Sequence, residues 1–420
     1  MKPFISPLPV PLLLPLLNTA QANPLSIPSI SPTSTTTAKN GVSPQFFSSL
    51  ERLSRLVDIS YCVGTPGTGG LSPPFSCSSR CGDVDISGRL ELIKSWNTGF
   101  LSMEDSCGYV AFDHPPPPLL QHQQTSGKGN IVVAFRGTYS LVNTIVDLST
   151  VPQEYVPYPA GPGGGGGDGN DGGKKGPKCH NCTVHMGFMA SWKAAREIVL
   201  PMVEKARKKH PDYGVELVGH SLGGAVAMLA GLEMRAGLGW TETRVTTFGE
   251  PMVGNKGLVE FVDEVFGLKD EKTNGEGREY KRVTHRGDPV PLLPLREWGF
   301  RSHAGEVFIT KGDLPPGPRD LRVCEGDRDR GCLNGEDGDE ENEADEGWFG
   351  EMVRELRGKE DDELWERDAG WPTRFKLWQL LFAHRDYLWR LGLCVPGSDP
   401  IDWGRGRYNV SEGDDGMRDL

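Results

Sequence analysis

Short apolar runs separated by turn-forming residues recur along the chain, and we interpret them as buried strands. Ile131–Phe135 is entirely apolar, which is typical of a strand that is covered on both faces of a sheet. Further core strands are expected at Tyr109–Asp113, Val215–Val218, Val245–Phe248 and Tyr280–Thr284.

Apolar residues at helical spacing lie between and before these strands. From Pro44 onward, Phe46, Phe47, Leu50 and Leu53 would share one face of a helix. A long amphipathic helix is expected over Met189–Lys208, ended by His210-Pro211. Because strands alternate with helices, the sequence predicts an α/β fold with a mostly parallel central sheet and helices on both faces.

Several segments depart from this pattern and define the expected domain boundaries. Met1–Ala22 has Lys2, an apolar stretch and a small-residue cleavage site, as a secretory signal peptide does. Ser, Thr and Pro dominate residues 23–43, which predicts a flexible leader, and residues 397–420 predict a flexible tail. One domain is therefore expected over residues 44–396. It contains a disordered glycine-rich loop at 161–176 and an acidic insert at about 333–370.

The acidic insert accounts for the net charge of −12, because residues 325–370 hold 19 acidic and 6 basic side chains. The remainder of the chain is close to neutral, which argues against a nucleic-acid partner. After the signal peptide no apolar stretch has the length of a membrane span. We therefore expect a secreted, monomeric protein without a transmembrane segment. Asn409 begins a sequon in the expected tail and is a candidate glycosylation site.

The strand ending at Val218 runs into Gly219-His220-Ser221-Leu222-Gly223, and a helix rich in small residues follows. A serine on such a strand-turn-helix bend projects its hydroxyl clear of the sheet. The glycines remove the Cβ atoms that would collide there. The N–H of Leu222 lies at a helix N-terminus, where negative charge is favoured. Ser221 is therefore a candidate nucleophile for acyl transfer, with Leu222 as an oxyanion donor.

A serine nucleophile needs an imidazole to accept its proton and a carboxylate to orient that imidazole. Asp288 follows the strand expected at Tyr280–Thr284, so it would lie at the same sheet edge as Ser221. Two histidines come later in the chain, His303 and His384, and the residues alone leave both open.

Five segments, in order, resemble the fungal class 3 lipases, a family that includes the type A feruloyl esterases. They are Phe135-Arg136-Gly137-Thr138, Val184-His185-Met186-Gly187-Phe188, the run from Gly219 to Gly224, Thr247-Phe248-Gly249-Glu250-Pro251-Met252-Val253-Gly254-Asn255, and His303-Ala304-Gly305-Glu306. The resemblance covers about residues 44–396 and implies an α/β-hydrolase fold and carboxylester hydrolysis without a cofactor.

By this resemblance the catalytic residues are Ser221, Asp288 and His384, and Thr138 supplies the second oxyanion donor. The family's catalytic histidine precedes an aromatic residue and a cysteine near the C-terminus, as His384 precedes Tyr387 and Cys394. His303 lies in a segment that is not catalytic in the family. The family's lid corresponds to Leu141, Val142, Asn143, Thr144, Ile145, Val146 and Asp147.

The resemblance also implies four disulfides and leaves Cys107 unpaired. The expected pairs are Cys62–Cys394, Cys77–Cys81, Cys179–Cys182 and Cys324–Cys332. The alternative for Cys179 and Cys182 is a metal site. They lack a second ligand pair at zinc-finger distance, so we expect no metal.

The leading functional expectation is a secreted triacylglycerol lipase that acts on lipid esters at an oil–water or membrane-like interface. Leu141, Val142, Ile145 and Val146 would form one apolar face on a short helix, and such a lid favours opening at a lipid surface. A soluble esterase, such as a feruloyl esterase, is the alternative of the same chemical class. A catalytically inactive binding protein with a hydrolase fold is the remaining one, and the intact Ser221, Asp288 and His384 argue against it.

Overall fold

The computed structural model divides the chain into two units, Met1–Thr37 and Ala38–Leu420, and all described residues belong to the second. It describes residues 41–64, 69–79, 81–84, 88–99, 105–115, 128–138, 148, 155–157, 177–269, 275–326, 329, 331–333, 383–392 and 394. The expected signal peptide, lid, glycine-rich loop and tail with Asn409 lie outside these residues, as do most of the leader and most of the acidic insert.

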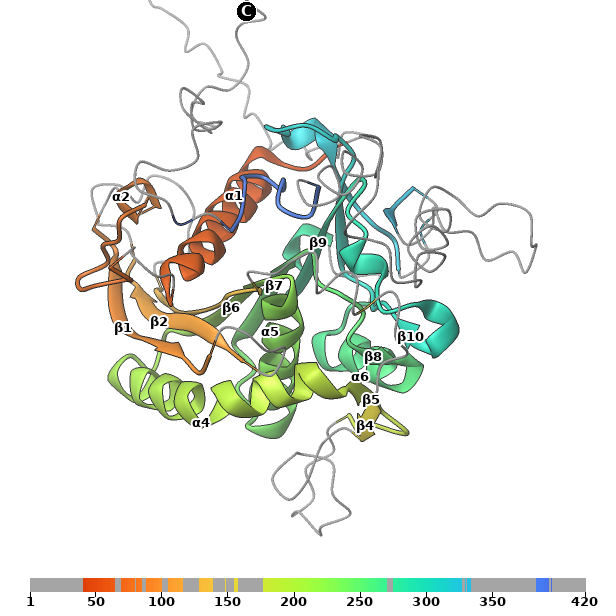
Figure 1. The fold of residues 1–420 in the computed structure, drawn as a ribbon, viewed down its shortest axis with the longest axis horizontal. Helices are drawn as coiled ribbons and strands as arrows, with labels where there is room; N and C mark the ends of the chain where they lie inside the picture. The colour runs from red at the N-terminus through yellow and green to blue at the C-terminus, as the bar shows by residue number, and fades with distance from the viewer. Residues whose placement is uncertain are drawn as a thin grey trace, which may run out of the picture. The chain divides into compact units, whose positions relative to one another are not determined.

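An eight-stranded sheet organises the described part of the chain (Figure 1). Its order is β1 (Leu90–Asn97), β2 (Cys107–Asp113), β3 (Asn130–Phe135), β6 (Gly214–His220), β7 (Thr243–Phe248), β9 (Tyr280–His285), β11 (Glu306–Ile309) and β12 (Leu321–Val323). The pairs from β3 to β11 are parallel, and those involving β1, β2 and β12 are antiparallel. The predicted α/β class with a mostly parallel centre is confirmed.

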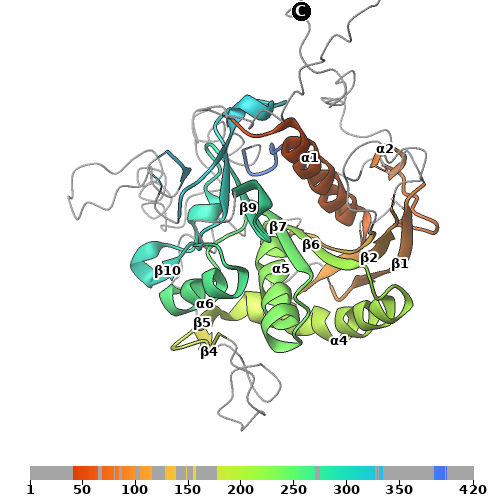
Figure 2. The same cartoon turned by 180° about the vertical axis from the view of Figure 1, so that it is seen from behind.

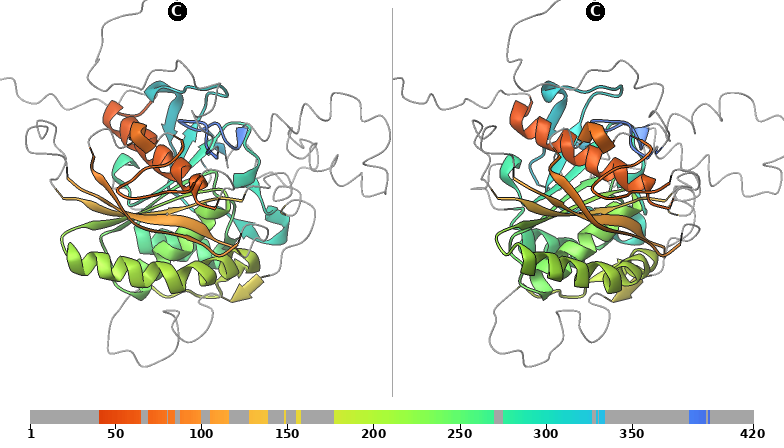
Figure 3. Two further views of the ribbon diagram at one scale, coloured as in Figure 1. Left: turned by 60° about the vertical axis from the view of Figure 1, so that its left-hand side comes forward. Right: turned by 90° about the vertical axis from the view of Figure 1, so that its left-hand side faces the viewer.

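Helices cover both faces of this sheet, as predicted. Figure 3 shows α1 (Pro44–Ile59, orange-red) on one side and α4 (Met186–Lys209, yellow-green) on the other. Side chains alternate accordingly: Ile131 and Val133 pack with α4, α5 (Leu222–Leu232) and α6 (Lys256–Phe266), whereas Val132 and Ala134 pack with α1. Successive strand residues point to opposite faces, so an all-apolar strand is filled on both.

A second, four-stranded sheet joins the start of α4 to the segment after β7. Its order is β10 (Phe300–Arg301), β8 (Gly254–Asn255), β5 (Thr183–His185) and β4 (Tyr155–Pro157). Figures 1 and 2, taken from opposite sides, both place these strands beside α6 and away from α1. A Cβ on Gly254 would lie 2.1 Å from the Thr183 carbonyl oxygen, so the two strands can approach this closely only with glycine there.

The helix expected at Met189–Lys208 begins three residues earlier, at Met186. The cause is His185, whose Nδ1 accepts the N–H groups of Gly187 at 3.1 Å and Phe188 at 3.3 Å. Histidine is not among the residues that usually cap helices, so this start could not be predicted from the sequence. Burial lowers the pKa of His185 from 6.5 to about 4, which keeps Nδ1 available as an acceptor.

Short helical elements follow α1 and α5, and four 3-10 turns lie later in the chain: η4 (Gly275–Gly277), η5 (Val290–Leu292), η6 (Arg296–Trp298) and η7 (Pro318–Asp320). The η1 turn (Ser60–Cys62) continues α1, and the short α2 (Cys81–Val84) follows it. Beyond α5, a π-helical turn, η3, spans Glu233–Gly237. Among the described helices, none is long and apolar enough to cross a membrane.

The four disulfides implied by the family resemblance are present, and they join Cys62–Cys394, Cys77–Cys81, Cys179–Cys182 and Cys324–Cys332. The first spans 332 residues and in the chain-entropy model contributes about 5 kcal/mol. Cys107 is unpaired and buried, and its thiol donates to Asn97 Oδ1 at 2.8 Å.

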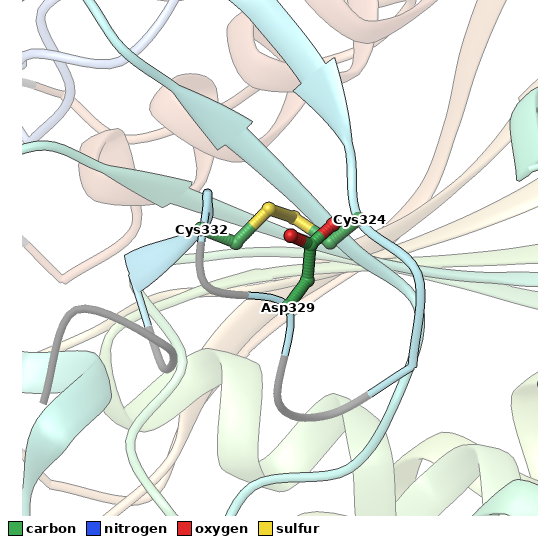
Figure 4. Close-up of side chains that lie close together, drawn as sticks. All are labelled: Cys324, Asp329 and Cys332. Atoms are coloured by element: carbon green, nitrogen blue, oxygen red, sulfur yellow. A yellow bond between two sulfur atoms is a disulfide. The ribbon is translucent and has the colours of Figure 1, made fainter. Parts of the chain in front are cut away.

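Disulfide bonding removes the metal interpretation of Cys179 and Cys182. It also explains the one cluster of potential metal ligands among the described residues, Cys324, Asp329 and Cys332 (Figure 4). Both sulfurs there are bonded to each other. Asp329 accepts hydrogen bonds from Arg322 at 3.0 Å and from the Gly331 N–H at 2.9 Å, so its carboxylate orders the loop.

We predict that His185 makes the protein acid-sensitive. Its folded pKa of about 4 lies below the ordinary 6.5, so between these values the unfolded chain binds a proton that the folded chain does not. Its stabilising contribution is complete above pH 6.5 and is lost as the pH falls towards 4. Compared with His185→Asn, the wild type should lose about 3 kcal/mol more unfolding free energy over this interval. Chemical denaturation at pH 7 and pH 4 measures the difference, with the exposed His180→Asn as the control. Parallel curves for the wild type and His185→Asn would contradict the prediction.

We also predict one free thiol per molecule. Titration of the denatured, unreduced protein should detect Cys107 alone, because the other eight cysteines are bonded in pairs. The Cys107→Ser variant should give none. A count of three in the wild type would mean that one of the four bridges does not form.

Candidate active site

Ser221 occupies a strained turn between β6 and α5. Its φ of 58° and ψ of −131° place a non-glycine residue in a backbone region that L residues rarely adopt. The flanking glycines make the turn possible. A Cβ on Gly219 would lie 2.1 Å from the Gly223 carbonyl oxygen, and one on Gly223 would lie 2.3 Å from that of Phe135. The predicted nucleophile position is therefore a strand-turn-helix bend of the expected kind.

The loop that follows β3 passes directly against this turn. A Cβ on Gly137 would lie 2.9 Å from the Ser221 Cβ, so residues 136–138 lie beside the serine. Arg136 holds the loop, because Nη1 donates to the Val63 carbonyl at 2.6 Å and Nε to that of Gly137 at 3.2 Å. Thr138 is half-buried at the end of the loop, and Leu222 is the first residue of α5. Both expected oxyanion donors thus flank Ser221.

Asp288 and His384 form a buried pair although they are 96 residues apart. His384 Nδ1 lies 3.0 Å from Asp288 Oδ1 and 2.9 Å from Oδ2, and both side chains are fully buried. The carboxylate also accepts the Val290 N–H at 2.9 Å and the Tyr387 hydroxyl. Burial alone would raise the pKa of Asp288, but His384, Tyr387 and Val290 together lower it below its ordinary value. Asp288 is therefore a carboxylate at neutral pH.

The other ring nitrogen of His384 points away from Asp288 and has no hydrogen-bond partner among the described residues. His384 Nε2 and Ser221 Oγ are both buried and have no hydrogen-bond partner among the described residues. The His384 ring lies 4.6 Å from the ring of His220, the residue that precedes Ser221. In the neutral ring, an Nδ1 that donates to Asp288 leaves the lone pair on Nε2. An imidazole in this state can accept the proton of a serine hydroxyl.

Gly249, at the carboxyl end of β7, leaves room for His384. It has a φ of 61°, and a Cβ there would lie 2.8 Å from His384 Cε1 and 2.7 Å from the Tyr387 hydroxyl oxygen. Any larger residue would displace the imidazole from Asp288.

His303 lies in a different polar cluster. Its Nδ1 donates to the Ala304 carbonyl at 2.6 Å, and its Nε2 lies 3.1 Å from Glu250 Oε1. Glu250 also accepts the Tyr280 hydroxyl at 2.6 Å. The structure thus pairs Asp288 with His384, and His303 with Glu250.

Sequence reasoning missed Tyr387, His220 and Gly249, which contact His384 or its carboxylate partner. In the sequence, Tyr387 is simply an aromatic residue near the C-terminus, and His220 is the residue between Gly219 and Ser221. Their hydrogen bonds connect distant parts of the chain, so no local pattern could have revealed them. The lid residues Leu141–Asp147 lie outside the described residues.

The fold and this arrangement of serine, imidazole and carboxylate define the α/β-hydrolase class. The profile of the family "Lipase (class 3)" matches residues 132–298. Two similar relatives are "Secreted mono- and diacylglycerol lipase 2" of Gibberella zeae, 54% identical over 90% of this chain and 89% of the relative, and "Lipase A" of Sodiomyces alcalophilus, 52% identical over 87% and 86%. Among solved structures, the LIP2 lipase of Yarrowia lipolytica is 26% identical, with a TM-score of 0.63 over 85% of this chain and 98% of that one.

The chain belongs to the class 3 lipase family. It is accordingly a lipase, a serine carboxylester hydrolase.

We predict that the two buried histidines respond differently to removal. His384→Ala and Ser221→Ala should each lose nearly all esterase activity while remaining folded, because residues of a catalytic triad act as a unit. His303→Ala should keep its kcat per folded molecule and unfold at a lower temperature, because Glu250 loses a buried partner. Active-site titration with a soluble p-nitrophenyl ester, together with thermal unfolding, measures both effects. A folded but inactive His303→Ala variant would reverse the assignment of the base.

Proposed function

We propose that the protein is an extracellular lipase that hydrolyses acylglycerols, with Ser221 as nucleophile, His384 as general base and Asp288 as the orienting carboxylate. The observation that carries this proposal is the buried Asp288–His384 pair beside the strained Ser221. The four disulfides, and the word "secreted" in the name of the 54% identical Gibberella zeae relative, support an oxidising, extracellular location.

The proposed reaction has two halves. Ser221 Oγ attacks the ester carbonyl carbon, and His384 Nε2 takes the hydroxyl proton. The N–H groups of Leu222 and Thr138 stabilise the oxygen anion that forms. His384 then returns the proton to the departing alcohol, which leaves an acyl-serine. Water, activated by the same imidazole, releases the fatty acid and restores Ser221.

Asp288 is the fixed element in this sequence. Its lowered pKa keeps it ionised, so it can stabilise the imidazolium that forms when His384 accepts the proton. It does not itself need to take up a proton.

The substrate is proposed to be an acylglycerol at a lipid surface. The apolar lid positions Leu141, Val142, Ile145 and Val146 motivate this interfacial proposal and the expectation of triacylglycerol hydrolysis. The name of the 54% identical Gibberella zeae relative favours mono- and diacylglycerols as a second candidate. A feruloyl ester is the third, motivated by the Cys179–Cys182 bridge, which resembles one in the feruloyl esterases.

We predict that emulsified acylglycerols are better substrates than methyl ferulate. The rate on tributyrin should rise when the substrate concentration passes its solubility limit, because a lipid surface favours an open, apolar lid. Val142→Asp/Ile145→Asp should reduce that rise and leave the rate on dissolved ester largely unchanged.

Diolein and triolein emulsions, compared at equal surface area, decide between partial and complete acylglycerols. Ser221→Ala is the control for contaminating esterase. A smooth saturation curve through the solubility limit, with methyl ferulate as the better substrate, would overturn the proposal.

A further inference from the structure

His220, which lies between Gly219 and Ser221, makes two buried hydrogen bonds that the proposed reaction does not use. Its Nε2 lies 2.8 Å from the backbone carbonyl oxygen of His384, and its Nδ1 lies 2.5 Å from the Tyr61 hydroxyl. The side chain is fully buried. A polar group is costly to bury unless it is hydrogen-bonded, so an apolar residue would be the simpler choice if these bonds served no purpose.

The direction of each bond follows from its acceptor. A carbonyl oxygen can only accept, so His220 Nε2 carries the hydrogen and donates to His384. In the neutral ring Nδ1 must then accept, and Tyr61 donates to it. Burial, together with the nearby His384, lowers the pKa of His220 well below its usual value, which keeps the ring neutral.

Tyr61 continues this chain to the oxyanion loop. Its oxygen accepts the backbone N–H of Gly137, and a Cβ on Gly137 would lie only 2.5 Å from it. Burial raises the pKa of Tyr61, so the hydroxyl keeps its proton. One directed series of hydrogen bonds therefore runs from Gly137 through Tyr61 and His220 to the main chain of His384.

The segment around His384 is anchored by buried apolar side chains rather than by regular secondary structure, and these are Tyr387, Leu388, Trp389 and Leu391. Described residues 384–392 belong to no helix or strand, and one isolated bridge joins Asp386 to Arg390. The segment is tied to the end of α1 by the Cys62–Cys394 disulfide and by the Gly392 N–H, which donates to Asp58 Oδ1 at 2.9 Å. His220 is the contact that reaches the His384 backbone from the turn that bears Ser221.

We propose that His220 is a positioning residue that, with Tyr61, holds the His384 backbone and the oxyanion loop in register with Ser221. The inference rests on the proposed roles of Ser221 and His384. It adds a specific function for the side chain between Gly219 and Ser221 in the motif.

The test compares two replacements of similar size. His220→Met removes both hydrogen bonds, and kcat should fall about 10- to 100-fold with KM within about twofold, since small misplacements of a catalytic group have effects of this size. His220→Gln keeps an N–H donor near the position of Nε2 and should recover most of the lost kcat. His303→Met is the matched buried histidine, and its kcat per folded molecule should stay at the wild-type value.

Tyr61→Phe tests the other end of the series. It should lower kcat about 10-fold, because the Gly137 N–H and His220 Nδ1 both lose their partner. The double variant Tyr61→Phe/His220→Met should be no more than about twofold below His220→Met, since the two residues act through one series. Tyr109→Phe is the control, because this equally buried hydroxyl donates to the Leu56 carbonyl at 2.7 Å, near the end of α1.

The low-field NMR resonance of the His384 Nδ1–H proton, which is shared with Asp288, distinguishes a positioning role from general destabilisation. It should shift or broaden in His220→Met and be unchanged in His303→Met and Tyr109→Phe. Wild-type kcat in folded His220→Met would overturn the inference. So would equal losses in His220→Met and His220→Gln with an unchanged resonance. Ser221→Ala separates this from the proposed function: if that variant stays active, the proposed function fails, whatever the His220 variants do.

Discussion

The close approach of β6 to α5 at Ser221 is the constraint on which the rest of the site depends. The strand and the helix approach each other so closely at this turn that a Cβ atom on either side would collide with the backbone. Glycine at positions 219 and 223 makes the close approach possible. The turn forces a serine into a rare backbone conformation and buries it against the loop after β3. A residue held in this way has few alternative positions, so the groups that act on it need only be brought to one place.

Bringing those groups together depends on parts of the chain with very different support. Asp288 follows β9, a central strand of the sheet, and its position is set by the fold itself. His384 comes from a segment without regular structure and is placed by individual contacts with Asp288, His220 and Gly249. Its geometry is therefore more sensitive to single side chains than that of Asp288.

The core strands could be predicted because apolar runs such as Ile131–Phe135 reflect burial on both faces, and burial is a property of each residue. Strands β5, β8 and β10 have only two or three residues each, which is too short for a pattern of apolar and polar positions, so they could not be predicted from the sequence. The start of α4 was misplaced because a histidine caps it. Ser221 was a candidate from its local motif, and Asp288 from its place after a core strand. The choice of His384 over His303 depended on the family resemblance. The bonds of Tyr387 and His220 join residues about 100 to 160 positions apart, and no local pattern encodes them.

The Cys62–Cys394 bridge has a consequence for the long stretch between the two members of the Asp288–His384 pair. The segment that follows residues 334–382 and contains His384 is joined to the end of α1 by the Cys62–Cys394 disulfide as well as by the backbone. A single backbone cleavage within 334–382 would therefore leave two polypeptides in one covalent molecule, with His384 still attached beside Asp288. The length and composition of that stretch can change without releasing the imidazole, so the chain can carry a large acidic insertion between Asp288 and His384.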